Sequence, residues 1–478
     1  MIKEKIKKLR EKFDNLDIDG YVVPKNDEFF SEYAGIDRLK FISNFSGSAG
    51  YAIILKNKNY LFVDGRYTIQ AKIESGKYFK IIDYHKIFNC NLFKKLTIGL
   101  NPKLFTSDQI KKIFLKNNKI KLINSDLISQ NLSRKKKDKK YFFSISKEIC
   151  GESHLSKINK VLNSIKKLKA ESIFVTAPEN VAWLLNIRGH DNPNSPIPNC
   201  HLLLNDQRKF YLIADKAKTK KLILEKKLSQ KQIIDFKELE SFLEKYPNKR
   251  MIIDRKTCSL FYENLLKKTL NIHKKDDPIY MFKAIKNKIE INNMIKAHIS
   301  DGAALTKFIF WIKNINKKKI TEYDAQNKLE SFRKKSKEYL YPSFNTIAGT
   351  GSNGAIVHYR ATKKNTKTIS KKKLFLCDSG GQYKFGTTDV TRTICFSKPK
   401  KFIKNIFTKV LKGHIAVATT NLNKIKTGNL IDKRARKFLN LSNLDYSHGT
   451  GHGVGFFSNV HEGPQSISKF NKILISEG

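Results

Sequence analysis

The sequence predicts a mixed α/β (α+β) protein with more than one domain. The chain has 478 residues, whereas single hydrophobic cores stop growing near roughly 250–300 residues. Hydrophobic residues make up 40% of it, including 32 Phe and 18 Tyr, which excludes a disordered or fibrous class. Helical and strand patterns also alternate along much of the chain.

The first segment, residues 1–130, begins with an amphipathic surface helix. Its apolar residues recur at helical spacing between charged ones, at Ile2, Ile6, Leu9 and Phe13. The helix lacks the apolar core of a signal peptide and is too acidic for a typical transit peptide. Three short strands follow, the last two as a hairpin, at Gly20–Pro24, Tyr51–Leu55 and Tyr60–Val63.

A polar stretch, Asn131–Lys140 (NLSRKKKDKK), has almost nothing to bury, and we predict that it is a linker. The second segment, residues 141–282, repeats the order of the first. The strand at Ser172–Pro178 corresponds to Gly20–Pro24, and a hairpin at His201–Asp215 corresponds to the earlier hairpin. This echo favours two similar domains in tandem over the general likeness of any two α/β domains.

The third segment, residues 283–478, opens with a long amphipathic helix. Its apolar residues fall on or near one stripe, at Ile285, Ile289, Ile295, Ile299, Phe308 and Ile312. A second helix is expected at Thr321–Lys334, with Thr321 as its N-cap. Strands and glycine-rich turns follow, and Lys469–Gly478 ends without a capped helix or a polar tail.

The formal net charge of +50 first suggests a nucleic-acid partner. The lysines are, however, scattered over all regions, as in a coding sequence drifted toward A and T, and no nucleic-acid-binding motif is present. We therefore expect weak, salt-sensitive adhesion to polyanions and no specific nucleic-acid function.

The six cysteines lie far apart, which argues for a reducing compartment and against a disulfide framework or a thiolate zinc site. No window approaches the roughly 20 apolar residues of a membrane span. We expect a soluble cytoplasmic protein without a membrane partner.

Two carboxylates mark the third segment as chemically informative. Asp378 ends a buried strand (LFLC), Ser379–Phe385 is the expected turn, and Asp389 lies on the expected returning strand Gly386–Thr393. Like charges this close repel unless a cation lies between them, and hard divalent metals prefer carboxylate oxygens. Taken alone, the two residues fit turn capping better.

Histidines change that balance. His448, His452 and His461 lie within one short glycine-rich stretch, HGTGHGVG followed by HEGP, although the chain has 11 histidines in all. Three histidines together with two upstream aspartates indicate a metal or catalytic site.

A third element, Ser343–Tyr359, contributes His358. Its three glycines match G-x-G-x-x-G, but a dinucleotide site needs a strand before the glycines and a helix after them. Because Ala355–Tyr359 alternates like a strand and a lysine-rich loop follows, we reject a dinucleotide site.

These motifs resemble those of the aminopeptidase P family in the creatinase and methionine aminopeptidase superfamily. The resemblance rests on SFNTIAGTGSNGAIVHY, LFLCDSGGQYKFGTTDVTRTI and HGTGHGVGFFSNVHEGP, and it extends over essentially the whole chain through RLKFISNFSGSAG, LFVDGRY, ENVAWLLNIRGHD and NSPIP. It implies two creatinase-like domains, residues 1–130 and 141–282, followed by a pita-bread catalytic domain, residues 283–478.

The resemblance also implies the activity and its residues. The family removes the N-terminal residue from peptides whose second residue is proline, usually with two manganese ions. Asp378, Asp389 and His452 match metal ligands, and Asp389 matches the bridging one. His358, His448 and His461 match histidines that line the substrate and stabilise the transition state. Relatives are commonly homodimers.

Two glutamate ligands of the family pattern have no match before Gly478, since Glu477 corresponds to a position just before them. We therefore expect an incomplete pita-bread domain in the chain as printed, which would bind manganese weakly and turn over nothing. The rival hypotheses are a prolidase acting on Xaa-Pro dipeptides and an inactive remnant or binding protein.

Two weaker features keep their alternatives. Trp183, Arg188 and His190 either reach a neighbouring subunit's site or are a core Trp and a surface Arg. Arg392 either orients Asp389 or lies on the solvent face of its strand.

Overall fold

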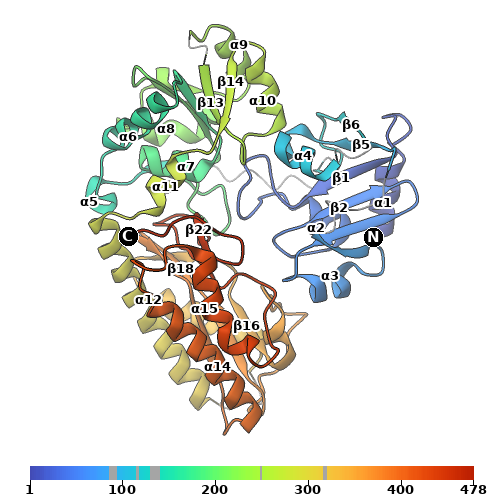
Figure 1. Cartoon of the computed structure of the whole chain (residues 1–478), viewed down its shortest axis with the longest axis vertical. Coiled ribbons are helices and arrows are strands. Elements are labelled where there is room, and N and C mark those ends of the chain that lie inside the picture. The colour runs from blue at the N-terminus through green and yellow to red at the C-terminus, as the bar shows by residue number, and fades with distance from the viewer. Residues whose placement is uncertain (85–93, 115–117, 130–139, 248–249, 316–319) are drawn as a thin grey trace. The chain divides into compact units, whose positions relative to one another are not determined.

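The chain forms two compact units, drawn in Figure 1. The computed structural model describes residues 1–84, 94–114, 118–129, 140–247, 250–315 and 320–478. The first unit comprises residues 1–147 and 152–279, and the second comprises residues 148–151 and 280–478. Most of the predicted linker Asn131–Lys140 lies outside the described residues, and the domain boundaries given above remain predictions.

The first sheet has the strand order β4-β3-β2-β1-β5-β6. The central strand β1 pairs antiparallel with β2 and parallel with β5, and β2 pairs antiparallel with β3 as predicted. The strands are β1 Gly20–Pro24, β2 Tyr51–Leu55, β3 Asn59–Val63, β4 Lys80–Asp83, β5 Thr97–Leu100 and β6 Lys119–Leu122. The helices are α1 Ile2–Arg10, α2 Arg38–Ser43, α3 Thr68–Ser75 and α4 Ser107–Phe114. One core, which includes Ile6, Leu9 and Phe13 of the predicted N-terminal stripe, packs against this sheet.

The second sheet repeats this topology with the order β12-β11-β10-β8-β13-β14. Its central strand β8 pairs antiparallel with β10 and parallel with β13, and β10 pairs antiparallel with β11. The strands are β8 Ser172–Val175, β10 His201–Asn205, β11 Phe210–Ile213, β12 Ile233–Ile234, β13 Arg250–Asp254 and β14 Asn271–Lys275. The helices are α6 His154–Lys167, α7 Pro178–Leu185, α8 Lys216–Leu224, α9 Leu239–Glu244 and α10 Leu260–Lys267, and a short pair joins β7 Phe143–Ser144 to β9 Ile187–Arg188. The shared topology agrees with the tandem echo in the sequence.

The second unit combines helices with three small sheets. Their orders are β15-β18-β19, β16-β17-β20 and β21-β22. The strands are β15 Tyr339–Pro342, β16 Ile347–Thr350, β17 Phe375–Ser379, β18 Gly381–Tyr383, β19 Gly386–Thr387, β20 Val390–Ile394, β21 Gly451–Gly453 and β22 Glu462–Ile467. The helices are α5 Lys147–Cys150, α11 Ile279–Ala284, α12 Lys288–Asn314, α13 Glu322–Arg333, α14 Lys401–Ala418 and α15 Gly428–Asn440. Thr321 caps α13 as predicted, with Asp324 completing the capping box.

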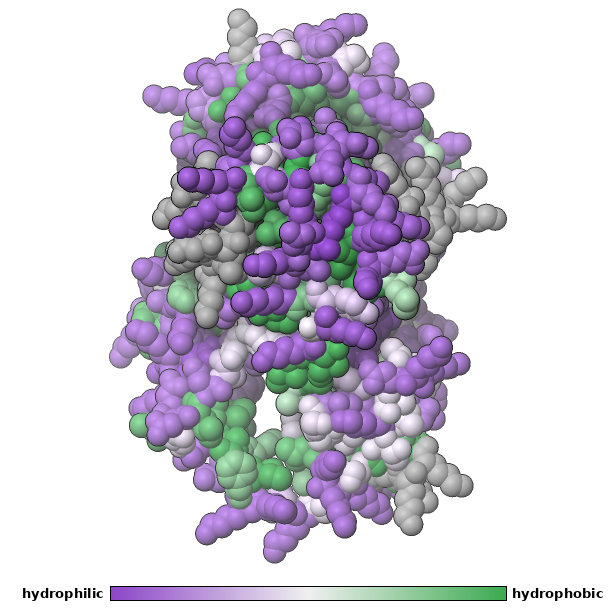
Figure 2. Space-filling model, turned by 90° about the vertical axis from the view of Figure 1, so that its right-hand side faces the viewer, coloured by the Kyte–Doolittle hydropathy of each residue, from purple (hydrophilic) through white to green (hydrophobic). Residues whose placement is uncertain are grey.

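The predicted apolar stripe of α12 is wrong in its first half. Ile295 and Ile299 are 53% and 67% exposed, whereas Phe308 and Ile312 are fully buried. The second half packs under the sheet β16-β17-β20, but the first half buries small and polar residues, Glu290, Ala297 and Asp301. Figure 2, which views the molecule from the right-hand side of Figure 1, shows further apolar side chains at the surface in the lower part of the view.

The segment around the aspartates also differs from its prediction. The expected turn Ser379–Phe385 contains β18, and the expected strand Gly386–Thr393 is split into β19 and β20, which belong to different sheets. A tight crossing causes the split, because a Cβ on Gly380 would lie 1.9 Å from the Thr388 carbonyl oxygen. The Thr388 N–H donates to the Gly381 carbonyl at 2.9 Å.

The strand expected at Ala355–Tyr359 is wrong as well. A 3-10 helix spans Gly351–Ala355, and the chain then turns, with the Tyr359 N–H donating to the Ile356 carbonyl and His358 at φ +59°. No α-helix directly follows the glycines in this described stretch, so the dinucleotide site stays rejected. Among the described residues, no helix is long and apolar enough to cross a membrane.

Candidate metal centre and its histidines

Asp378 occupies the middle strand of the sheet β16-β17-β20. Its Cα partners are Ile347 and Thr391, and the neighbouring Cys377 is buried in the apolar core. Successive side chains of a strand point to opposite faces, so Asp378 leaves the face opposite that core. There the Thr391 hydroxyl donates to Asp378 Oδ1 at 2.7 Å.

Asp389 lies directly before β20, and its side chain is 20% exposed. Burial first, and then the negative charge of Asp389, raise the pKa of Asp378 to about 6. The Thr391 hydrogen bond and the charges of His452 and His461 act in the opposite direction. The two carboxylates therefore share one electrostatic environment, as the sequence predicts.

Two histidines face these carboxylates. His452, on β21, places Nε2 at 3.3 Å from Asp389 Oδ2, and its ring centroid lies 4.2 Å from that of His461. The His461 ring lies 6.3 Å from that of His358. Five of the six predicted site residues thus form one cluster, brought from four separate segments of the second unit.

The donor chemistry of this cluster fits a cation. His452 Nδ1 lies 2.8 Å from the Gly453 carbonyl oxygen, and because a carbonyl can only accept, Nδ1 carries the proton. In the neutral ring, the Nε2 lone pair then faces the Asp389 carboxylate, and two acceptors at this distance need a proton or a cation between them. Within the described residues, however, no three His, Cys, Asp or Glu side chains close on a single ion.

His448 does not join the cluster. Its ring packs on Tyr446 with centroids 4.8 Å apart, its Nδ1 lies 2.7 Å from the Gly449 carbonyl, and its own carbonyl accepts from Arg436 at 2.6 Å. Among the contacts resolved for the described residues, none joins the His448 ring to His452 or to the aspartates. Its predicted role remains a prediction.

The loop that carries His358 is held by a residue that the sequence did not reveal. Glu322, the first residue of α13, is fully buried. One carboxylate oxygen accepts from the Thr350 N–H at 2.7 Å, and the other accepts from the Tyr359 hydroxyl at 2.8 Å and the Lys367 N–H at 2.9 Å. Its place at a helix start, where the dipole favours negative charge, was visible in the sequence, but its partners were not.

The structure also bears on the weaker predictions. Trp183 is 6% exposed with Lys157 Nζ 4.2 Å from its ring centroid, and Arg188 is 2% exposed and donates to the Ala182 carbonyl. Both belong to the interior of the first unit, so Arg188 is not a surface residue. Arg392 is exposed and donates to the Thr391 carbonyl, which agrees with the solvent-face alternative.

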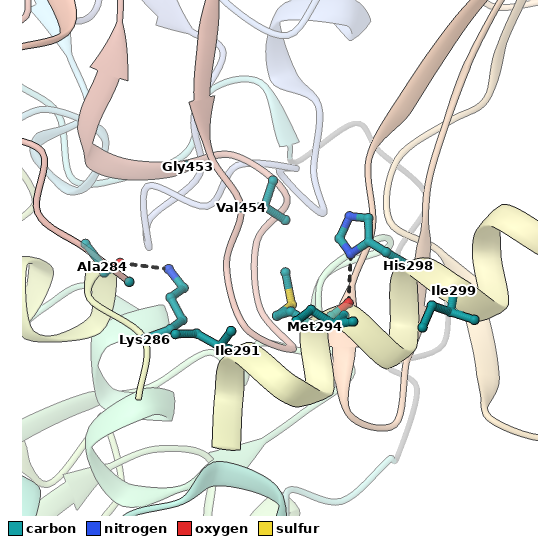
Figure 3. A pocket seen from close by; sticks show the side chains of 10 residues that line it. Ala284, Lys286, Ile291, Met294, His298, Ile299, Gly453 and Val454 are labelled. Atoms are coloured by element: carbon teal, nitrogen blue, oxygen red, sulfur yellow. Dashed lines mark hydrogen bonds between the residues drawn. The ribbon is translucent and has the colours of Figure 1, made fainter. Parts of the chain in front are cut away.

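A hollow of about 600 Å³ lies beside the cluster, on the exposed half of α12. Figure 3 shows Lys286 at one end and Ile299 at the other, with Val454 facing the helix. The His298 ring bonds through Nδ1 to the Met294 carbonyl at 2.8 Å. The isoleucines misassigned to the core therefore line this hollow.

Family profiles match all three parts of the chain. The metallopeptidase family M24 matches residues 292–478, and two creatinase/prolidase N-terminal domain profiles match residues 5–130 and 133–290. A probable Xaa-Pro aminopeptidase P of Laccaria bicolor is 37% identical over 97% of this chain and 76% of its own length. Xaa-Pro aminopeptidase 1 of Dictyostelium discoideum is 33% identical over 98% of this chain and 79% of its own length.

Solved structures agree with these matches. The X-prolyl aminopeptidase of Caenorhabditis elegans, described as a cytosolic enzyme with a di-nuclear active site, superposes with a TM-score of 0.90 and 26% identity over 100% of this chain and 83% of its own. The prolidase of Pyrococcus horikoshii, with a TM-score of 0.54, 24% identity and coverage of 68% and 88%, shares the fold. The mixed α/β fold with two creatinase-type domains and an M24 domain is thereby confirmed.

Proposed function

The chain belongs to the Xaa-Pro aminopeptidase P family of M24 metallopeptidases, and on this basis we propose that the protein its gene encodes is a metal-dependent aminopeptidase. Its substrates are peptides with proline in second position, from which it removes the N-terminal residue. The observation that carries the proposal is the meeting of Asp378 and Asp389 with His452 and His461.

Asp378, Asp389 and His452 would hold divalent cations, in our proposal two manganese ions. Hard cations prefer carboxylate oxygens, and imidazole is a common further donor. The di-nuclear site described for the Caenorhabditis elegans enzyme supports the number. When bound, such ions supply a Lewis acid for the scissile carbonyl and a more acidic water at neutral pH.

The remaining histidines would act on the substrate. The His461 ring centroid lies 4.2 Å from that of His452 and 6.3 Å from that of His358, and its ring can donate a hydrogen bond to charge that develops on the carbonyl oxygen. His358 would contact the peptide beside His461. His448 is assigned to the same task on the sequence pattern.

The test is hydrolysis of Xaa-Pro-Pro peptides by the protein as its gene encodes it, after chelation and after addition of manganese. We expect manganese-dependent release of the first residue. Asp389→Asn should lose about 100-fold or more in activity, because mutating even a residue that only hydrogen-bonds a metal ligand typically lowers activity 10–100-fold. Failure to release that residue with manganese would end the proposal. Cleavage of Xaa-Pro dipeptides but not of longer peptides would instead identify a prolidase.

We further propose a cytoplasmic homodimer. The cytosolic description of the Caenorhabditis elegans enzyme supports the compartment, as do the cysteines, which form no disulfide among the described residues. The resemblance to commonly dimeric relatives supports the assembly. Light scattering in solution measures it, and a monomer mass would contradict it.

A further inference from the structure

Glu462 directly follows His461 and is among the most deeply buried carboxylates of the second unit. Its side chain is 2% exposed, whereas His461 is an exposed residue. The His461 ring centroid lies 4.2 Å from that of His452. Because His461 and Glu462 share a peptide bond, a fixed Glu462 limits where the backbone of His461 can lie.

Two lysines hold the Glu462 carboxylate, one on each oxygen. Lys283 Nζ donates to Oε1 at 2.8 Å, and Lys286 Nζ donates to Oε2. Their side chains are 5% and 10% exposed, so the three charges lie away from bulk water. Charge-assisted hydrogen bonds of this kind are about twice as strong as neutral ones, and a carboxylate bonded through both oxygens can hardly change its orientation.

The clamp also fixes the strand that carries His452. Glu462 is the first residue of β22, and its Cα partner on β21 is Gly453, the neighbour of His452. A Cβ on Gly453 would lie 2.7 Å from the Glu462 carbonyl oxygen, so the two strands approach closely at this point. Lys283 lies on α11, and Lys286 lies in the turn before α12. Through Glu462, the two lysines therefore connect the strands β21 and β22 to α11 and to the segment before α12.

We propose that Glu462, clamped by Lys283 and Lys286, is a positioning residue that sets His461 in place for the reaction. This inference rests on the proposed aminopeptidase function, which it deepens. Neither lysine nor Glu462 touches the cluster directly in the contacts described above, so their effect passes through the backbone of His461. Residues that orient an active group in this way typically contribute 10–100-fold to activity.

The chain offers a matched control in the first unit. Glu263 is 3% exposed and is likewise held by two lysines, with Lys267 Nζ at 2.7 Å and Lys274 Nζ at 2.9 Å. Glu263→Gln likewise removes the charge of a buried carboxylate held by two lysines, which here are 52% and 27% exposed, in a place that contains no residue of the proposed centre. Its stability loss calibrates that of Glu462→Gln.

The experiment measures kcat and KM on an Xaa-Pro-Pro peptide, thermal stability, and the ring NMR signals of 13C-labelled histidine. We expect Glu462→Gln to lower kcat about 10–100-fold with KM little changed, and to shift the His461 signal, which is assigned by its loss in His461→Gln. Glu263→Gln should lose similar stability but keep kcat and the His461 signal. If Glu462→Gln does not fold, Lys286→Met carries the test, because it leaves the Lys283–Glu462 pair intact.

A folded Glu462→Gln or Lys286→Met protein with unchanged kcat and an unchanged His461 signal would overturn the proposal. So would an equal loss of kcat in Glu263→Gln, since the effect would then be one of general stability. If the unmodified protein releases no residue, the aminopeptidase function fails, but the NMR signal still decides whether Glu462 positions His461.

Discussion

At the scale of single residues, one hydroxyl orients one carboxylate. Thr391 lies opposite Asp378 on β20 and donates to its Oδ1 at 2.7 Å. Without that donor, the carboxylate could rotate toward or away from Asp389, which repels it. The orientation of a proposed metal ligand therefore depends on a threonine that the sequence motifs did not single out.

We accordingly predict that Thr391→Val lowers kcat/KM about 10–100-fold while the protein stays folded, because valine keeps the shape and removes the donor. Thr391→Ser should recover most of the activity. Thr393→Val is the matched control, since it changes an exposed threonine of the same strand. Steady-state kinetics decides, and full activity in Thr391→Val would contradict the assigned role.

A second residue-scale feature concerns acid stability. His201 is fully buried among aromatic rings, including Tyr262 at 4.7 Å, with Nδ1 3.1 Å from the Thr176 carbonyl. Burial lowers its pKa to about 4, below the ordinary value of 6.5. Between these two values the unfolded chain binds a proton that the folded protein does not, so stability falls as the pH drops from about 6.5 to about 4.

We predict that this histidine costs the protein on the order of 3 kcal/mol of unfolding free energy between pH 6.5 and pH 4. His201→Gln can still donate to the Thr176 carbonyl but does not titrate, so its urea midpoint should fall less on acidification. His273→Gln, an exposed histidine of the same unit, should behave like the unmodified protein. Parallel midpoint shifts in all three proteins would refute the assignment.

At the scale of elements, the start of a helix holds the loop that carries His358. The carboxylate of Glu322 on α13 accepts hydrogen bonds from Thr350 before the 3-10 helix and from Tyr359 and Lys367 after it. His358 precedes Tyr359 and has φ +59°, a conformation that non-glycine residues adopt at a cost. Glu322 holds the loop on both sides of this strained residue.

We predict that Glu322→Gln lowers both stability and kcat. The amide cannot accept through both ends, so at least one buried donor loses its partner, at a cost of about 1–3 kcal/mol. Asp324→Asn, which disturbs the capping box in the same first turn of the helix, should lower stability but spare kcat. Urea unfolding and steady-state kinetics measure the two effects, and equal losses of kcat in both variants would contradict a specific role.

Helices and strands were predicted correctly from the sequence where the local residue pattern allowed a single interpretation. The strand Gly20–Pro24 and the capped helix after Thr321 were correct because burial and capping are local signals. The stripe of α12 failed because half of that helix buries small and polar residues, and no sequence period distinguishes the two halves. Gly386–Thr393 failed because the switch between sheets depends on a contact of Gly380 with Thr388 across the turn.

The site shows the same division. The aspartates and histidines were predictable because rare residue types recur in motifs of known chemistry. The residues that hold these aspartates and histidines in place were not predictable. Lys283 and Lys286 are two among 93 Lys and Arg residues, so nothing in the sequence distinguishes them. Glu462 is visible within the motif HEGP, but its two lysine partners lie 179 and 176 residues earlier in the chain.

At the scale of the whole molecule, two sheets of one topology precede the unit that carries the cluster. This order agrees with the tandem echo in the sequence, and it is what the three family profiles match. Neither N-terminal sheet supplies a residue to the predicted centre.

The net charge of +50 is a property of the whole chain. It predicts that DNA binding depends on the salt concentration and not on the DNA sequence. Counterion release makes the logarithm of the binding constant fall by about 0.9 per phosphate contact for each unit of log salt. We expect two unrelated DNA duplexes to bind equally at 50 mM salt and to lose about 10³–10⁵ in affinity by 200 mM, if 6–10 phosphates are contacted. Fluorescence anisotropy measures this. A duplex preferred over the other, or tight binding that survives high salt, would mean that the scattered lysines form a specific surface and that a nucleic-acid function was wrongly excluded.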